Sequence, residues 1–273
     1  MGNRRYLEEL NKDSTREIFE SFKKLPANQL KLIYNTADWA YINHSEFKAV
    51  YDLLRPYFNK KLRLLDVGCG DGRFLIPLEG KFRLYGLDFS KSFLREVKKH
   101  CKSCRTIFGH AEKLPFKSDY FDVVLSVRLI QHLSKKQQQN AIDEMYRVVK
   151  PGGKVIVLNY NSMSALNIYK KICQSKTPKF WPFIKWRWVI DEYNSPSELK
   201  AMFKRAGFNR IRTTGCTLGE PDVLRLTKIS SFLEKISRKI PLKYYGLCER
   251  LESYVKSTPL ANLMNRVVII GGK

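Results

Sequence analysis

Three glycines and a carboxylate early in the chain have the types and spacing needed to bind a nucleotide. Gly68, Gly70 and Gly72 follow an apolar run, and glycines let the main chain turn sharply and come close to a ligand. The next apolar run ends at Asp88, 20 residues after the first glycine, where a carboxylate can accept hydrogen bonds from a ribose diol. The pattern predicts the first strand, loop and helix of a doubly wound nucleotide-binding fold. A tight turn without a ligand is the alternative.

The spacing of the glycines indicates which nucleotide fits. A dinucleotide site needs its third glycine five residues after the first, and that position is Arg73 here. The third glycine comes one residue earlier, and Asp66 precedes the loop. Gly68-x-Gly70-x-Gly72 with this acid resembles the first motif of class I S-adenosylmethionine-dependent methyltransferases.

The elements around this loop alternate between short apolar runs and helical patterns, as a parallel sheet with crossover helices requires. The predicted strands cover residues 63–67, 83–87, 105–108, 123–126, 154–159, 209–214 and 266–270. Helices are predicted from Gly72, after the capping residue Ser90, over 135–149 and over 195–206. The resemblance implies an α/β fold with a doubly wound, Rossmann-like, seven-stranded sheet whose last strand is antiparallel and lies beside the fifth.

Four further motifs extend the resemblance over residues 62–160. They are Gly109–Phe116, Phe121–Val124, Gln131–Leu133 and Arg147–Gly153, in the order and spacing of the family. Two positions depart from its pattern. His110 stands where the family usually has an acid that binds the adenine amino group, and Gln131-His132 replaces a frequent pair of histidines. The resemblance then implies that the adenine is contacted either by His110 or by Glu112 together with main-chain groups.

The resemblance implies that S-adenosylmethionine binds along the carboxyl edge of the sheet. It places the methionine end at the glycine loop, the ribose at Asp88 and the adenine against Phe89. It places the sulfonium beside residues 126–128. The cofactor contacts implied in this way are Asp66, Gly68, Cys69, Gly70, Asp88, Phe89, Ala111, Glu112 and Val127.

Methyl transfer from a sulfonium is a direct displacement, so catalysis consists largely of holding the acceptor in line with the methyl group. A general base is needed only where the acceptor carries a proton of high pKa. His132 is the predicted base, although a structural role is the alternative, and Tyr41 and His44 are weaker candidates. Tyr41, Arg128 and Trp186 are the predicted acceptor-binding residues, with Arg128 suited to an anionic group or else directed into solvent.

The predicted organisation is a helical N-terminal arm over residues 1–61 and a methyltransferase domain over 62–273. Helices are expected at 14–24, 28–41 and 46–54 in the arm. The domain carries two expected cap insertions, 160–194 and 215–264, placed above the ligand crevice.

The formal net charge is +24, and residues 161–273 hold 21 basic and 8 acidic side chains, a net of +13. This surplus favours an anionic partner, such as a phosphorylated substrate, an acidic membrane or a nucleic acid, with a merely solvated surface as the alternative. The first insertion contains an aromatic and basic cluster over 179–188, which includes Trp186. Such a cluster suits a membrane interface, stacked bases, an apolar pocket or a small core of the cap. A basic amphipathic helix is expected over 224–240.

The six cysteines follow no disulfide framework, which fits a reducing compartment. Cys101 and Cys104 have the spacing of half a metal knuckle, but no second pair accompanies them, so no metal is expected. The N-terminal segment has no apolar core typical of a signal peptide, and no run is long enough to span a bilayer. A cytoplasmic protein is expected, with peripheral membrane contact as an option.

The function predicted from these observations is S-adenosylmethionine-dependent methyl transfer to a small or lipid-like acceptor that is anionic or membrane-associated. A tRNA methyltransferase is the alternative, because residues 126–153 are similar to the wobble-uridine carboxymethyl methyltransferases and the charge suits RNA. A non-catalytic binding module on the same fold is a third hypothesis. The intact glycine loop and Asp88 count against it.

Overall fold

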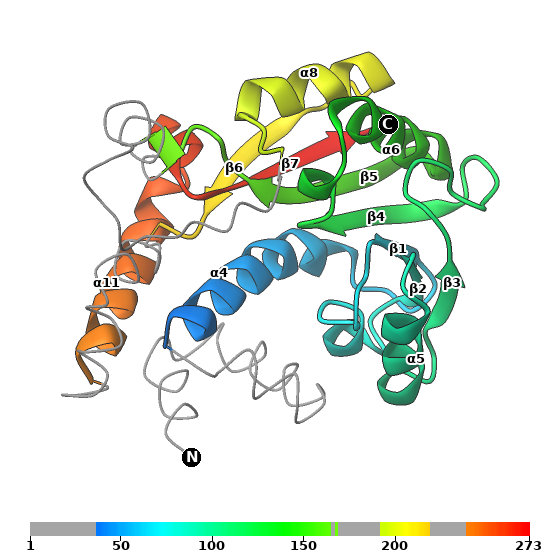
Figure 1. Ribbon diagram of the computed structural model, residues 1–273, viewed down its shortest axis with the longest axis horizontal. Coiled ribbons are helices and arrows are strands. Elements are labelled where there is room, and N and C mark those ends of the chain that lie inside the picture. The colour runs from blue at the N-terminus through cyan, green and yellow to red at the C-terminus, as the bar shows by residue number, and fades with distance from the viewer. Residues whose placement is uncertain (1–36, 165–166, 169–191, 219–238) are drawn as a thin grey trace, which may run out of the picture.

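The computed structural model describes residues 37–164, 167–168, 192–218 and 239–273, and a seven-stranded sheet lies at its centre (Figure 1). The strand order is β3-β2-β1-β4-β5-β7-β6, and β7 is antiparallel to both of its neighbours. The predicted fold class is therefore confirmed. The strands are β1 Arg63–Val67, β2 Arg83–Asp88, β3 Arg105–Phe108, β4 Phe121–Val127, β5 Val149–Tyr160, β6 Arg212–Cys216 and β7 Arg266–Gly272.

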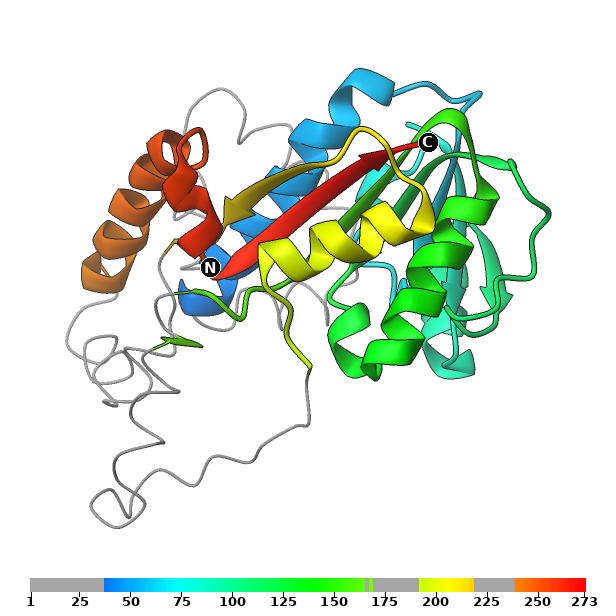
Figure 2. The same ribbon diagram turned by 90° about the horizontal axis from the view of Figure 1, so that it is seen from above.

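Helices cover both faces of the sheet. In Figures 1 and 2, α4 and α5 lie on one face and α6 and α8 on the other, so the fold has three layers. The helices are α4 Ala37–Leu54, α5 Lys91–His100, α6 Lys135–Val148, α8 Pro196–Ala206 and α11 Lys239–Val255. Short 3-10 turns are η1 Arg55–Tyr57, η2 Ile76–Leu78, η3 Ile130–His132 and η4 Pro259–Leu263.

Alternation along the strands builds two cores, one on each side of the sheet. Leu64 points to the side of α4 and α5, whereas its neighbour Leu65 points to the side of α6 and α8. Successive strand residues point to opposite faces, so an unbroken apolar strand fills both cores. The buried strands β1, β4 and β5 therefore read as continuous apolar runs, as expected for a sheet covered on both faces.

The segment after Gly72 differs from the prediction of an α-helix. It forms a turn and the short η2, which holds Pro77. Proline removes a main-chain donor and hinders a continuing helix, and Gly80 then takes a left-handed conformation with φ of +82°. The loop is therefore followed by a compact turn that buries Leu75 and Ile76 against the sheet.

The helix α4 also differs from the prediction, because residues 37–54 form one helix where two were expected with a break near residue 43. Asn and Ser compete with the helical main chain when their side chains bond locally. Here the side chains of Asn43, His44 and Ser45 bond instead to Arg73, Glu249 and Glu252, far along the chain. These tertiary contacts leave the helix continuous.

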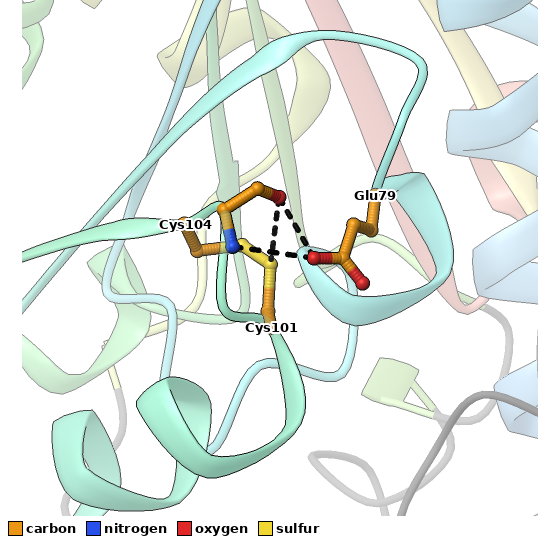
Figure 3. Close-up of a disulfide and its surroundings, with 4 residues drawn as sticks. Glu79, Cys101 and Cys104 are labelled. Carbon is orange, nitrogen blue, oxygen red and sulfur yellow. Dashed lines mark hydrogen bonds between the residues drawn. A yellow bond between two sulfur atoms is a disulfide. The ribbon is translucent and has the colours of Figure 1, made fainter.

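A disulfide joins Cys101 and Cys104 at the turn between α5 and β3, as Figure 3 shows. Ser103 lies within this turn and donates from its main-chain N and its Oγ to Glu79 Oε1, at 3.3 and 2.8 Å. The expectation that the cysteines stay unpaired is therefore wrong for this pair. Cys69, Cys216 and Cys248 are free and buried.

Several predicted features lie outside the described residues. These are the helix at 14–24, the start of the helix at 28–41, the aromatic cluster at 179–188 with Trp186, and most of the helix at 224–240. The boundaries of the arm and of the two insertions therefore stay predictions. Among the helices that the structure describes, none combines the length and the apolar character needed to cross a bilayer.

Candidate functional site

The glycine loop, residues 68–72, is fastened to the end of β2 by main-chain hydrogen bonds. The N–H groups of Gly68 and Cys69 both donate to the carbonyl of Leu87, at 2.8 and 3.0 Å. Gly86 lies directly beneath, where an added Cβ would come within 2.9 Å of the Cys69 sulfur. The loop therefore packs on β2 more closely than any side chain at residue 86 allows.

The loop glycines have left-handed main-chain conformations, which L-residues with a Cβ rarely adopt. Gly68 has φ of +75°, and a Cβ there would meet the side chain of Leu129 at 2.9 Å. Gly70 has φ of +54°, but no heavy atom lies within 4 Å of the place its Cβ would take. Gly68 is thus required by packing, while Gly70 borders open space in which a ligand can approach the main chain.

Asp88 is held in one orientation at the tip of β2. Its Oδ2 accepts from the Gly70 N–H at 2.9 Å, and its Oδ1 accepts from the Ser90 N–H at 2.8 Å. A carboxylate has about four lone-pair positions, so both oxygens keep capacity for a further donor. This carboxylate, buried and oriented in advance, can accept two hydroxyl hydrogens of a ribose.

Asp66 is a second buried carboxylate beside the loop. Burial raises its pKa to about 7, an effect that Arg73 opposes and Asp88 reinforces. A cationic group at this position would favour the ionised form. The position therefore suits the ammonium group of an amino acid such as methionine.

Exposed aromatic side chains continue the site beyond Asp88. Phe89 is 66% exposed, and Phe108, which ends β3 opposite Asp88, is 51% exposed. The ring of His110 meets that of Phe108 edge-on at 6.3 Å. Large apolar rings so placed can pack on the flat face of a base. Phe108 was not predicted, although its place at the end of a strand next to Asp88 is the sequence signal that could have found it.

The two residues expected to border the adenine differ in how they are held. Ala111 is buried in the core on the side of α6. Glu112 accepts a hydrogen bond from Gln137 Nε2 at 2.9 Å through its Oε1. Its carboxylate is thus tied to α6, whereas His110 forms a short bridge with Lys113.

The end of β4 forms the next part of the carboxyl edge. Ser126 is buried and donates from Oγ to the carbonyl of Val67 at 3.1 Å, which ties β4 to the loop. Val127 is half-buried. Arg128 then turns with φ of +55°, and its N–H donates to Leu158 at 2.8 Å. A non-glycine residue in this conformation is strained by about 1–2 kcal/mol, and such strain persists only where the surrounding structure imposes it.

The predicted catalytic and acceptor residues lie in different surroundings. His132 ends η3 and is exposed, with Nε2 3.4 Å from Gln131 Nε2. Tyr41 is fully buried, donates to Glu252 Oε2 at 3.2 Å and accepts from the Leu218 N–H at 3.0 Å. Its hydroxyl therefore joins α4 to α11. Trp186 lies outside the described residues.

A cluster of charged side chains that sequence reasoning missed lies at the same edge. Glu46 on α4 is fully buried and contacts three guanidinium groups, those of Arg73, Arg128 and Arg266. We call these four residues the arginine cluster. Burial would raise the pKa of Glu46, but the three guanidinium groups lower it to about 2. The signals in the sequence were a charged residue at the start of the apolar strand β7 and an acid on the buried face of α4.

The fold and the loop define a nucleotide-binding α/β domain of the methyltransferase type. Residues 65–157 match the family described as methyltransferase domain. These residues span β1 to β5 and include the glycine loop, Asp88 and Arg128. Residues 65–157 therefore form a methyltransferase domain, and the sheet around them has the class I, Rossmann-like arrangement.

Known proteins resemble different lengths of the chain. A protein of Encephalitozoon cuniculi named provisionally as a methyltransferase is 35% identical over 111 residues, 40% of this chain and 50% of that protein. The demethylmenaquinone methyltransferase of Anoxybacillus flavithermus is 28% identical over 186 residues, 60% of this chain and 77% of that protein. The chain thus spans half the length of the first relative.

Among solved structures, an S-adenosylmethionine-dependent methyltransferase of Thermotoga maritima superposes with a TM-score of 0.57 at 21% identity. The match covers 93% of this chain and 98% of that one. At this identity the likeness is one of fold.

Proposed function

We propose that this chain binds S-adenosylmethionine and transfers its methyl group to a small or lipid-like acceptor that is anionic or membrane-associated. The observation that carries the proposal is the Asp88 carboxylate, fixed by the N–H groups of Gly70 and Ser90 beside exposed aromatic rings. The open space at Gly70 and the buried Asp66 fit the amino-acid end of the same ligand. When bound, the cofactor supplies a methyl group on a sulfonium, a good leaving group.

The protein's part in this reaction is to hold two molecules in line. Asp88 accepts the ribose hydroxyls, and Asp66 in its ionised form pairs with the ammonium group. Phe89 and Phe108 pack on the adenine. Because the bound geometry removes the entropic cost of the encounter, positioning of this kind contributes a large part of the rate.

His132 is the proposed general base where the acceptor carries a proton of high pKa. It lies on η3, four residues after Arg128, and is exposed at the carboxyl edge of the sheet. An acceptor proton would pass to its imidazole as the new bond to carbon forms. An acceptor that is already an anion has no need of this step.

An apolar surface supports the lipid-like acceptor. Leu247, Leu251 and Tyr254 recur every three to four residues on α11 and are exposed, as are Leu260 and Leu263 on η4. The element η4 leads into β7, whose first residue Arg266 pairs with Tyr160 at the end of β5. The apolar surface is therefore close to the carboxyl edge. The demethylmenaquinone methyltransferases, which match at 28–29% identity, are named for a lipid-like quinone.

The experiment that tests the proposal follows labelled methyl groups. Purified protein is incubated with methyl-labelled S-adenosylmethionine and, separately, with total lipid and total RNA from cells that lack the protein. Label is expected in a lipid product and is expected to be lost with Asp88→Ala. Label in tRNA would instead support the alternative. Absence of label in both fractions, together with no calorimetric binding of S-adenosylhomocysteine, would contradict the methyltransferase proposal.

A further inference from the structure

The arginine cluster brings three cations to one carboxylate. Arg73 Nη2 lies 2.9 Å from Glu46 Oε2, Arg266 Nε lies 3.1 Å from Oε1, and Arg128 Nε lies 3.6 Å from Oε2. Glu46 is ionised at neutral pH, because its pKa is about 2. It is the carboxylate that all three guanidinium groups share, and the charges of Asp66 and Asp71 act on Arg73 as well.

The three arginines have different surroundings. Arg266 is 2% exposed, donates to the Asn265 carbonyl at 3.2 Å and stacks on Tyr160 at 3.7 Å from the ring centre. Arg73 is 14% exposed and also donates to Asn43 Oδ1. The side chain of Arg128 is 25% exposed, and its 3.6 Å approach to Glu46 is too long for a hydrogen bond. Arg128 is thus the member of the cluster with the most accessible donors.

Arg73 and Arg128 repel each other in this arrangement. Burial and the Arg128 charge together lower the pKa of Arg73 to about 10, although Glu46 and Asp71 act in the opposite direction. An anion that bridges the two guanidinium groups would relieve this repulsion. The planar guanidinium fork binds two oxygens of a carboxylate or phosphate at once, which a single point charge does not match.

The place of the pair ties it to the methyl-transfer site. Arg73 directly follows the glycine loop, and its charge is felt by Asp66. Arg128 directly follows β4, in a left-handed conformation. Arg73 and Arg128 therefore lie between the glycine loop and the beginning of β7.

We infer that Arg73 and Arg128, oriented by Glu46, bind one carboxylate or phosphate group of a substrate in the reaction. The inference rests on the proposed function. Two molecules could bring this group. It is either the anionic group of the methyl acceptor or the methionine carboxylate of the cofactor, and the test separates them.

The test compares the wild type with Arg128→Gln, which removes the charge and the fork. Calorimetry measures binding of S-adenosylhomocysteine and of 5′-methylthioadenosine, which lacks the amino-acid part. If the cofactor carboxylate fills the site, Arg128→Gln lowers the affinity for S-adenosylhomocysteine at least tenfold and leaves the affinity for methylthioadenosine unchanged. If the acceptor fills it, both affinities stay unchanged. In that case inorganic phosphate, titrated by phosphorus NMR, binds the wild type and not the variant.

Two controls keep the outcome interpretable. Arg205→Gln removes a cation on α8 that contacts Gln139 and should change neither measurement. Arg128→Lys keeps the charge but lacks the guanidinium fork, so its affinity for the ligand that fills the site should fall at least several-fold. This variant replaces Arg128→Gln if the latter fails to fold. If the wild type and both Arg128 variants bind S-adenosylhomocysteine, methylthioadenosine and phosphate with equal affinities, the inference of an anion site is contradicted. Phosphate is also titrated into the protein without nucleotide, so the site is tested even if S-adenosylhomocysteine does not bind and the proposed function fails.

Discussion

The glycine loop and the arginine cluster lie at the same edge of the sheet, but they are held in different ways. The loop is fixed by main-chain groups, with Gly68, Cys69 and Gly70 donating to Leu87 and Asp88. The cluster is fixed mainly by side chains, and the described ion pairs of its three arginines share Glu46.

This difference indicates which amino-acid substitutions each region can tolerate. A region held by the main chain depends on conformation, so glycine substitutions and strand packing control it. A region held by one buried carboxylate depends on that group, because loss of a single partner leaves several charges buried without compensation.

The largest expected effect comes from breaking the cluster at its centre. Glu46→Gln leaves three arginines without their carboxylate, and breaking a buried ion pair costs about 3–5 kcal/mol. The free energy of unfolding in urea should fall by about that amount. Glu96→Gln removes an exposed partner of Lys99 and is the control, with no measurable loss expected. A Glu46→Gln protein as stable as the wild type would show that the cluster does not hold this edge together.

On the loop side, Asp88→Ala removes the acceptor of the ribose hydrogen bonds. A hydrogen bond to a charged group is worth ~1.5–3 kcal/mol, so the affinity for S-adenosylhomocysteine should fall roughly tenfold to a hundredfold. Calorimetry measures the loss, and Asp143→Ala on the outside of α6 is the control. Unchanged affinity in a folded Asp88→Ala protein would mean that the ribose binds elsewhere.

The pH dependence of binding sharpens the comparison at Asp66. Its pKa is about 7 in the free protein, and an ammonium group binds only its ionised form strongly. Affinity for S-adenosylhomocysteine should therefore rise about tenfold from pH 6 to pH 8, following the ionised fraction. Asp66→Asn should remove this dependence, and methylthioadenosine should lack it. A flat profile for the wild type would place the ammonium group away from Asp66.

The same pKa has a consequence for stability. The ordinary pKa of this carboxyl is 3.8, so between about pH 4 and pH 7 the folded protein without ligand keeps a proton that the unfolded chain has lost. The contribution of Asp66 to stability therefore decreases as the pH rises through this window. The free energy of unfolding of the wild type, relative to that of Asp66→Asn, should therefore fall as the pH rises from about 4 to about 7.

The smallest expected effect concerns the main chain of the loop. Gly70→Ala imposes a left-handed conformation on a residue with a Cβ and should cost about 1 kcal/mol without any clash. Gly68→Ala has the same conformational cost and also meets Leu129 at 2.9 Å, so it should cost more. Urea unfolding of the two variants measures the difference. Equal costs would mean that Leu129 moves aside freely.

Much of the fold could be predicted because its signals are local. Apolar runs gave six of the strands within a few residues at each end, and the glycine spacing placed the loop that Asp88 completes. The prediction of a helix after Gly72 was wrong because Pro77 and Gly80 interrupt the pattern. The predicted break in α4 was wrong because tertiary contacts satisfy Asn43 and its neighbours.

The arginine cluster could not be predicted in the same way. Glu46 reads as one polar residue in an amphipathic helix, and Arg266 as a charged end of a strand. Nothing near either residue in sequence identifies its partner. Only the insertion of β7 between β5 and β6 brings Arg266 to the carboxyl edge, where α4 covers it. Predicting the contact requires the sheet order together with the helix that packs over it.

The bonds around Glu46 also imply an order of events during folding. Arg266 and Glu46 are separated by 220 residues, whereas Gly70 and Asp88 are separated by 18. Closing a long loop costs more entropy than closing a short one, and distant pairings form slowly. The contact between the glycine loop and Asp88 can therefore form early, and the contact between Arg266 and Glu46 forms only once β7 has entered the sheet. A chain stopped before that step would have the glycine loop and Asp88 in place but would lack the Arg266 guanidinium that holds Glu46.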